Sequence, residues 1–134
     1  MATAYPSRAE PAAATHAHAT VCAVQGVFYL ATGIWPLVHI ESFVAVTGPK
    51  TDLWLVDTVG ALIAVIGLVL LNAARAGRVT RDIALLGTCV AAALAAIDVV
   101  FVTRHVIDQI YFADAAVEAL LIVWWGAAWR GVRD

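Results

Sequence analysis

The chain has 134 residues, of which 63% are hydrophobic and only 13% are charged, and its mean hydropathy is +0.88. Soluble domains usually contain about 25% charged residues, so this composition excludes an ordinary water-soluble globular protein. The net charge of −2 and the lack of a basic run exclude nucleic acid as a partner.

Residues 1–18, "MATAYPSRAEPAAATHAH", are rich in Ala, Pro and Thr and contain no apolar core. We expect a flexible tail here, followed by one membrane domain over residues 19–134. The tail differs from a signal peptide, because Arg8 is followed by Glu10, Pro11 and small residues instead of an apolar run.

Four apolar blocks follow the tail, and each has about the 20 residues that a helix needs to cross the hydrocarbon. Their ranges are 20–40, 54–73, 82–103 and 110–129. In lipid only helices and closed barrels satisfy the backbone, and these blocks lack the alternation of barrel strands. The sequence therefore predicts an all-α integral membrane four-helix bundle in a lipid bilayer. Residues 41–47 either extend the first span or lie in the interface.

The basic residues predict the orientation of the bundle. Six of the eight lie on one side: Arg8, Arg75, Arg78, Arg81, Arg130 and Arg133. The other two, Lys50 and Arg104, belong to the opposite loops. Because Lys and Arg are enriched in cytoplasmic loops, we expect both termini to be cytoplasmic and the protein to be a multi-pass protein of the inner membrane.

Four carboxyl groups lie three or more residues inside the predicted spans, all in the outer half of the membrane. From the rise of the α-helix, Asp57 is roughly 5 Å deep, Asp98 roughly 8 Å, Asp114 roughly 6 Å and Glu118 roughly 12 Å. An ionised Asp near a helix centre costs roughly 2.5–3.5 kcal/mol on insertion scales. We therefore expect all four to converge on the bundle interior, in an outward-facing polar pocket.

Helical spacing favours this convergence. One stripe of the first span carries five residues with polar or conformational roles: Gln25, Tyr29, Thr32, Pro36 and His39. A stripe of the second span combines Asp57 with small residues that permit close helix approach: Gly60, Ala64 and Gly67. His105 follows Asp98 by seven residues, which is one face of a helix.

We expect the acids to pair with His39, Arg104 and His105 near the outer surface. Simpler interpretations exist: Asp57 and Asp114 lie near helix N-termini, where the helix dipole favours a negative charge, and Asp98 could form a structural ion pair. Glu118 is the deepest acid and has no nearby cation in its own helix, so we expect a functional role for it. Trp124, Trp125 and Trp129 predict an inner aromatic belt, with Trp54 in the outer one.

The stretch "WPLVHIESFVAVTGPKTDLWLVDTVG", residues 35–60, resembles a group of small four-span bacterial membrane proteins without an assigned activity. The resemblance implies a four-span fold and a bacterial inner-membrane location, and it brings no catalytic residues. The overall plan is similar to that of DoxX-like membrane proteins in architecture only.

Several functions fit these features. The first is binding of a small or lipophilic ligand in the polar pocket. The second is proton-coupled or cation transport by a dimer, with Glu118 as the exchanging carboxylate. Small multidrug resistance transporters are similar in size and span number, but this chain has its glutamate in the last span and not the first.

A third possibility is a b-type haem protein with His39 and His105 as axial ligands. A fourth is an accessory subunit of a larger membrane complex, in which the acids are structural. An enzyme, with His39, Glu41 and the buried acids as acid–base groups, is the less favoured class, because the sequence contains no nucleophile elbow, metal-binding motif or phosphate loop. We therefore assign no catalytic residue. We expect no cofactor.

Overall fold

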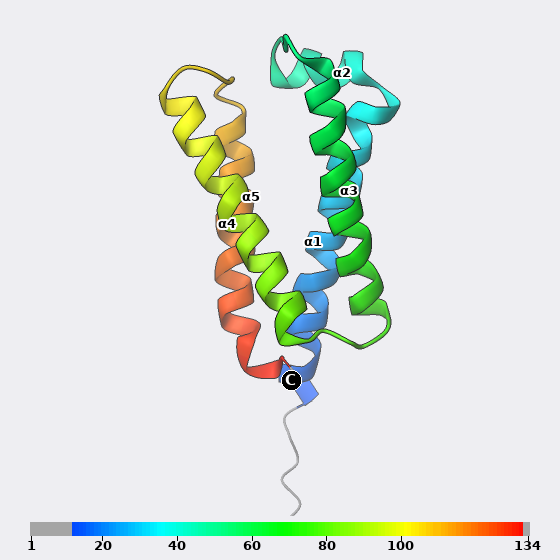
Figure 1. Cartoon of the computed structure of the whole chain (residues 1–134). Helices are drawn as coiled ribbons and strands as arrows, with labels where there is room; N and C mark the ends of the chain where they lie inside the picture. The colour runs from blue at the N-terminus through cyan, green and yellow to red at the C-terminus, as the bar shows by residue number, and fades with distance from the viewer. Residues whose placement is uncertain (1–11, 133–134) are drawn as a thin grey trace, which may run out of the picture.

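The computed structural model describes residues 12–132, and within this range the chain is helical without strands (Figure 1). The elements are α1 (Ala12–Val38), α2 (Ile40–Thr47), α3 (Leu53–Arg75), α4 (Arg81–Thr103), α5 (Tyr111–Ala128) and a short 3-10 helix, η1 (Trp129–Gly131). The helices α1, α3, α4 and α5 are long and apolar enough to span a bilayer. The prediction of an all-α, four-span membrane bundle is therefore confirmed.

The first helix begins earlier than the sequence analysis predicts. α1 starts at Ala12, inside the segment 1–18 that we expected to be a flexible tail. Three consecutive alanines open this helix, and alanine has the highest helix propensity. His18 is buried. Residues 12–18 therefore belong to the first helix and not to a tail, whereas residues 1–11 lie outside the described residues.

α1 and α2 are separate helices, because the backbone leaves the helical region at His39 (φ −150°, ψ 75°). The His39 ring caps α2 by accepting a hydrogen bond from the Ser42 N–H at 3.1 Å. Trp35 ties the two helices together, since its indole N–H donates to the Ser42 hydroxyl at 2.8 Å. Residues 40–47 therefore do not extend the first span as a continuous helix, and α2 lies at the end of the bundle where α1 ends (Figure 1).

Glycines bring α1 and α3 into backbone contact. A Cβ atom built on Gly33 of α1 would lie 2.5 Å from the Ala64 nitrogen of α3, and one on Gly67 would lie 2.5 Å from the Leu30 nitrogen. Gly60, Ala64 and Gly67 are all buried, so the structure confirms this part of the small-residue stripe. Close approach of this kind lets helices gain van der Waals contact in lipid, where no hydrophobic effect drives their association.

The bundle consists of two helix pairs, because α1 packs chiefly against α3 and α4 packs chiefly against α5. Figure 1 shows that the pairs lie closest where α1 starts and α5 ends, and diverge toward α2. The buried core extends through the close end and includes Val21, Leu70, Val79 and Trp125.

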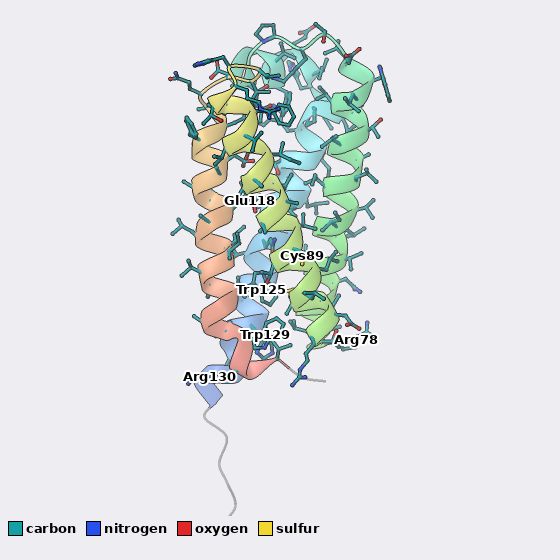
Figure 2. All side chains as sticks on the ribbon, turned by 60° about the vertical axis from the view of Figure 1, so that its left-hand side comes forward. Arg78, Cys89, Glu118, Trp125, Trp129 and Arg130 are labelled. Carbon is teal, nitrogen blue, oxygen red and sulfur yellow. The ribbon has the colours of Figure 1, made fainter. Side chains whose placement is uncertain are left out.

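The two ends of the bundle differ in charge. Arg75 ends α3, Arg81 begins α4 and Arg130 follows α5, so these arginines share one end, which we call the basic end. Figure 2 shows Arg78 and Arg130 at this end. Lys50 and Arg104 lie in the connections at the opposite end, which we call the α2 end. The chain thus has its described N-terminal and C-terminal helix ends on the same side as four of its arginines.

Candidate functional site: a column of buried polar groups

Glu118 is a fully buried carboxyl group near the middle of α5. It lies seven residues after Tyr111 and ten before Ala128, or roughly 10 and 15 Å along the axis. The buried face of α5 comprises Ala115, Glu118, Leu121, Trp125 and Ala128, which are spaced three or four residues apart. Glu118 therefore points into the bundle because its position falls on this face (Figure 2).

Tyr29 of α1 holds one side of this carboxyl group. The Tyr29 hydroxyl donates a hydrogen bond to Glu118 Oε2 at 2.8 Å, and both side chains are buried. The other oxygen, Oε1, is buried and has no hydrogen-bond partner among the described residues. A buried carboxylate oxygen without a partner is costly in hydrocarbon, so this oxygen is suited to holding a proton or a cation.

Asp98 and Asp114 form a second acidic group, one turn closer to the α2 end. Asp98 of α4 is 5% exposed, and its Oδ2 also lacks a hydrogen-bond partner in the described part of the chain. Asp114 of α5 is half-buried, and the two carboxyl groups lie within hydrogen-bonding range of each other. Two ionised carboxylates at this range repel each other, whereas a shared proton joins them.

Gln25 continues the polar groups toward the basic end. Its amide nitrogen Nε2 donates to the Gly87 carbonyl of α4 at 2.8 Å, and its oxygen Oε1 accepts from the Trp125 indole N–H at 2.7 Å. All hydrogen-bonding groups of this buried amide except one N–H are therefore accounted for by α4 and α5. A Cβ atom on Gly87 would lie 2.7 Å from Gln25 Oε1, so only glycine leaves room for this contact.

Together these side chains make what we call the polar column, which connects α1, α4 and α5. Its members are Gln25, Tyr29, Asp98, Asp114, Glu118 and Trp125. The column is acidic toward the α2 end and neutral toward the basic end. No group of three or more His, Cys, Asp or Glu side chains within residues 12–132 is arranged to hold a metal ion.

Tyr111 lies above the column at the α2 end, where it contacts the connection between α2 and α3. Lys50 Nζ lies 5.2 Å from the centroid of the Tyr111 ring. Partial burial lowers the pKa of the Lys50 ammonium from its ordinary value, and the nearby Asp108 carboxylate opposes this effect. The first turn of α5 therefore meets a positive charge from the other helix pair.

The structure brings some of the predicted site residues together and leaves others outside. Gln25, Tyr29, Asp98, Asp114 and Glu118 converge, as the sequence analysis predicts. Asp57 does not, because it lies on the exposed side of α3 while the glycine face of that helix packs on α1. The expected convergence of all four acids is therefore wrong for Asp57.

The expected cationic partners of the acids are also wrong. Arg104 and His105 are exposed, because α4 ends at Thr103 and the helical spacing from Asp98 does not continue to His105, which adopts φ 58°. His39 is exposed and caps α2. The acids instead meet Tyr29 and each other, and no feature of His39 or His105 favours a haem.

Trp125 is the main residue of the column that the sequence analysis assigned elsewhere. We expected it in an aromatic belt at the membrane surface, yet it is fully buried and hydrogen-bonded to Gln25. Its spacing of seven residues from Glu118 places both on one helix face, and this signal could have identified it. Trp124 and Trp129, which share the same sequence cluster, are exposed.

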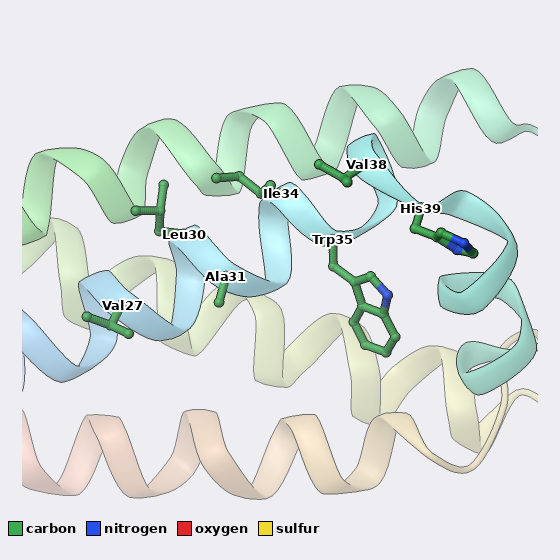
Figure 3. A pocket seen from close by; sticks show the side chains of 7 residues that line it. All are labelled: Val27, Leu30, Ala31, Ile34, Trp35, Val38 and His39. Carbon is green, nitrogen blue, oxygen red and sulfur yellow. The ribbon is translucent and has the colours of Figure 1, made fainter.

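A separate groove of about 470 Å³ runs along the exposed side of α1 (Figure 3). It is lined by Val27, Leu30, Ala31, Ile34, Trp35, Val38 and His39. This groove is apolar, and His39 is its only lining residue among the predicted site residues. The outward-facing polar pocket that we expected is therefore not this groove, and the acids are packed inside the bundle.

Comparison of the chain with models of known protein families, with characterised proteins and with solved structures gives no significant match. The geometry of the polar column is therefore the basis for any functional assignment.

Proposed function

We propose that this small integral membrane protein binds a positively charged, lipophilic ligand at the carboxyl groups of Asp98, Asp114 and Glu118, and that the ligand replaces a proton there. The observation that carries the proposal is the pair of buried oxygens without hydrogen-bond partners, Asp98 Oδ2 and Glu118 Oε1, both within the described residues. A bound cation would neutralise the charge that burial penalises.

The exchange balances in charge and atoms. In the free protein a carboxyl group holds the proton, and on binding the carboxyl O–H breaks, the proton goes to water and the carboxylate pairs with the cation. Tyr29 stays hydrogen-bonded to Glu118 Oε2 in both states, because a hydroxyl donates to a carboxylate or to a carboxylic acid oxygen. The surrounding helices supply an apolar environment that favours a lipophilic cation over a hydrated ion.

The distribution of arginines supports the orientation that we propose with this function. Arg75, Arg78, Arg81 and Arg130 lie at the basic end, and positive charges favour the cytoplasmic side. We propose an inner-membrane location with cytoplasmic termini, so that the acidic part of the column lies in the outer half of the membrane. A C-terminal fusion should accordingly fluoresce with green fluorescent protein and be inactive with alkaline phosphatase; the reverse pattern contradicts the orientation.

The binding experiment uses purified protein in detergent with tetraphenylphosphonium as the probe. We expect saturable binding and release of one proton per bound cation into weak buffer, and we expect Glu118→Gln and Asp98→Asn to abolish both. Asp57→Asn is the matched control, because it removes an intramembrane carboxyl group that is exposed. Absence of saturable binding by the wild type, or equal losses in Asp57→Asn and Glu118→Gln, contradicts the proposal.

Transport is the second candidate, and the position of Glu118 favours it. The carboxyl group lies near the middle of α5, so it is similarly distant from both membrane surfaces. A chain of this size would act as a dimer to enclose a path. In proteoliposomes a pH gradient should drive tetraphenylphosphonium uptake, and Glu118→Gln should abolish this uptake. Binding without uptake would contradict transport and support binding as the function.

A further inference from the structure

The two helix pairs are joined at the α2 end by a contact that we call the latch. It consists of Thr47, Gly48 and Lys50 on one side and Asp108 and Tyr111 on the other. Lys50 Nζ donates to the carbonyl oxygens of Thr47 at 2.7 Å and Gly48 at 3.0 Å, which folds the segment back on itself. The same ammonium group lies over the Tyr111 ring.

A further contact supports the latch. A Cβ atom built on Gly48 would lie 3.4 Å from the Cβ atom of Asp108, so the two connections touch. Thr47, whose carbonyl oxygen accepts from Lys50, is itself buried. The segment after α2 therefore meets the start of α5 through a cation–π contact and through the approach of Gly48 to Asp108.

The latch lies directly over the acidic part of the polar column. Asp114 and Glu118 follow Tyr111 by three and seven residues, which puts all three on one side of α5. Asp98 faces Asp114 and therefore lies on the same side of the bundle. Toward the basic end, the column closes with the buried layer of Gln25, Gly87 and Trp125.

We infer that the latch is the entrance gate of the acid cluster: the ligand reaches Asp98, Asp114 and Glu118 from the α2 end when Thr47–Lys50 leaves Tyr111. This inference rests on the proposed function, because it names the route to the proposed binding site. Within the described residues, the segment meets the other helix pair through the Lys50–Tyr111 and Gly48–Asp108 contacts, so it can move without disrupting a large interface. The cation–π contact of the part-buried Lys50 corresponds to a factor of about two to five or more in an equilibrium constant, which still allows the latch to open.

The test measures how fast a water-soluble carbodiimide modifies Asp114 and Glu118 in the purified full-length protein, with adducts located by peptide fragmentation and mass spectrometry. The exposed carboxyl group of Asp52 serves as the internal standard for reagent reactivity. Lys50→Met keeps an unbranched apolar stem but removes the ammonium group. We expect it to accelerate modification about two- to fivefold or more, in line with the loss of one cation–π contact.

Arg104→Gln is the matched control, because it removes an exposed cation at the same end, whereas the cation over the Tyr111 ring is that of Lys50. It should leave the rate unchanged. A second variant closes the gate: Gly48→Cys with Asp108→Cys, in a Cys89→Ser background, places two Cβ atoms 3.4 Å apart, close to their spacing across a disulfide. Because Gly48 has φ 85°, the cysteine there is strained, and the reduced double-cysteine protein is the reference for the oxidised one. Oxidation should slow modification at least fivefold, and reduction should restore it.

The outcomes separate the gate from the binding site. Equal rates in the wild type and Lys50→Met overturn the gate, and so do equal rates in the reduced and oxidised double-cysteine protein or a lack of modification even in Lys50→Met. If tetraphenylphosphonium still binds in those cases, the site stands and the ligand enters laterally from the lipid. If the rates respond as expected but the cation does not bind, the gate stands and the proposed ligand is wrong.

Discussion

α1 contacts α3 and the α4–α5 pair by different means. Against α3 it presents glycines, and the contact is backbone against backbone, with a Cβ atom on Gly33 only 2.5 Å from the Ala64 nitrogen. Against α4 and α5 it presents Gln25 and Tyr29, whose side chains form hydrogen bonds across the bundle. The same helix thus packs by close backbone contact on its α3 side and by side-chain hydrogen bonds on its α4 and α5 side. The α1–α3 contact builds a rigid pair, and the polar column carries the candidate function.

Gly33→Leu tests the close packing of α1 on α3 and should have the largest effect on stability. The new side chain would collide with the α3 backbone, which cannot move aside as a flexible side chain would. We expect a loss of about 3 kcal/mol or more in the free energy of unfolding, measured by reversible unfolding in mixed micelles followed by circular dichroism. Gly126→Ala is the control, because nothing lies within 4 Å of a Cβ atom there and alanine favours a helix. If both variants unfold alike, close packing does not hold α1 to α3.

On the polar side, Gln25→Leu should have the next largest effect. It removes the acceptor of the Trp125 indole N–H, which leaves that buried donor without a partner. It also removes the second donor to the Gly87 carbonyl, which keeps its helical backbone hydrogen bond within α4. We expect a loss of about 2 kcal/mol. A double-mutant cycle with Trp125→Phe should give a coupling energy of about 0.6 kcal/mol or more. Additive losses would show that the indole and the amide stabilise the bundle separately.

A pair of changes in the acidic part of the column should alter stability in opposite directions. Tyr29→Phe removes the hydrogen-bond donor to Glu118 and should cost about 1 kcal/mol. Asp98→Asn should instead stabilise by about 1 kcal/mol, because an amide N–H can donate to the facing Asp114 carboxylate. The same unfolding assay checks both, and a destabilised Asp98→Asn would mean that the two carboxyl groups already share a strong hydrogen bond.

The smallest effect should come from Asp57→Asn. Asp57 lies outside the polar column and is exposed, so its substitution should change the free energy of unfolding by less than about 0.5 kcal/mol. The comparison with Asp98→Asn shows whether burial, and not membrane depth alone, determines what an acid contributes. A large loss in Asp57→Asn would indicate that this carboxyl group has a partner outside the single chain.

The sequence predicts the spans well, because membrane thickness fixes their length. The predicted range 82–103 differs by one residue from α4, and 54–73 differs by one and two residues from the ends of α3. It also predicts the glycine face of α3, since small residues at helical spacing have few other uses in lipid. The sequence signals for the start of a helix are weaker. The alanines at the beginning of α1 produce no hydropathy peak, so α1 begins earlier than the sequence predicts.

The candidate site was predictable only in part. Glu118 and Tyr29 lie on stripes of their own helices, and an isolated acid in a span points inward. Which acids meet depends on how the helices are rotated, and spans that are apolar all round give no signal for that rotation. For this reason Asp57 was expected inside and Trp125 at the surface. The end of α4 at Thr103 likewise removed His105 from the face it was expected to share with Asp98.

The indole of Trp125 also gives the protein an optical reporter. The chain has five tryptophans, and Trp125 is fully buried between the two helix pairs while Trp54 is 68% exposed. Brominated lipids should quench the emission of the exposed indoles and spare Trp125. The residual, blue-shifted fluorescence then reports on the interface between the two helix pairs. A ligand that separates the pairs would change the emission wavelength and lifetime of Trp125 without any added label.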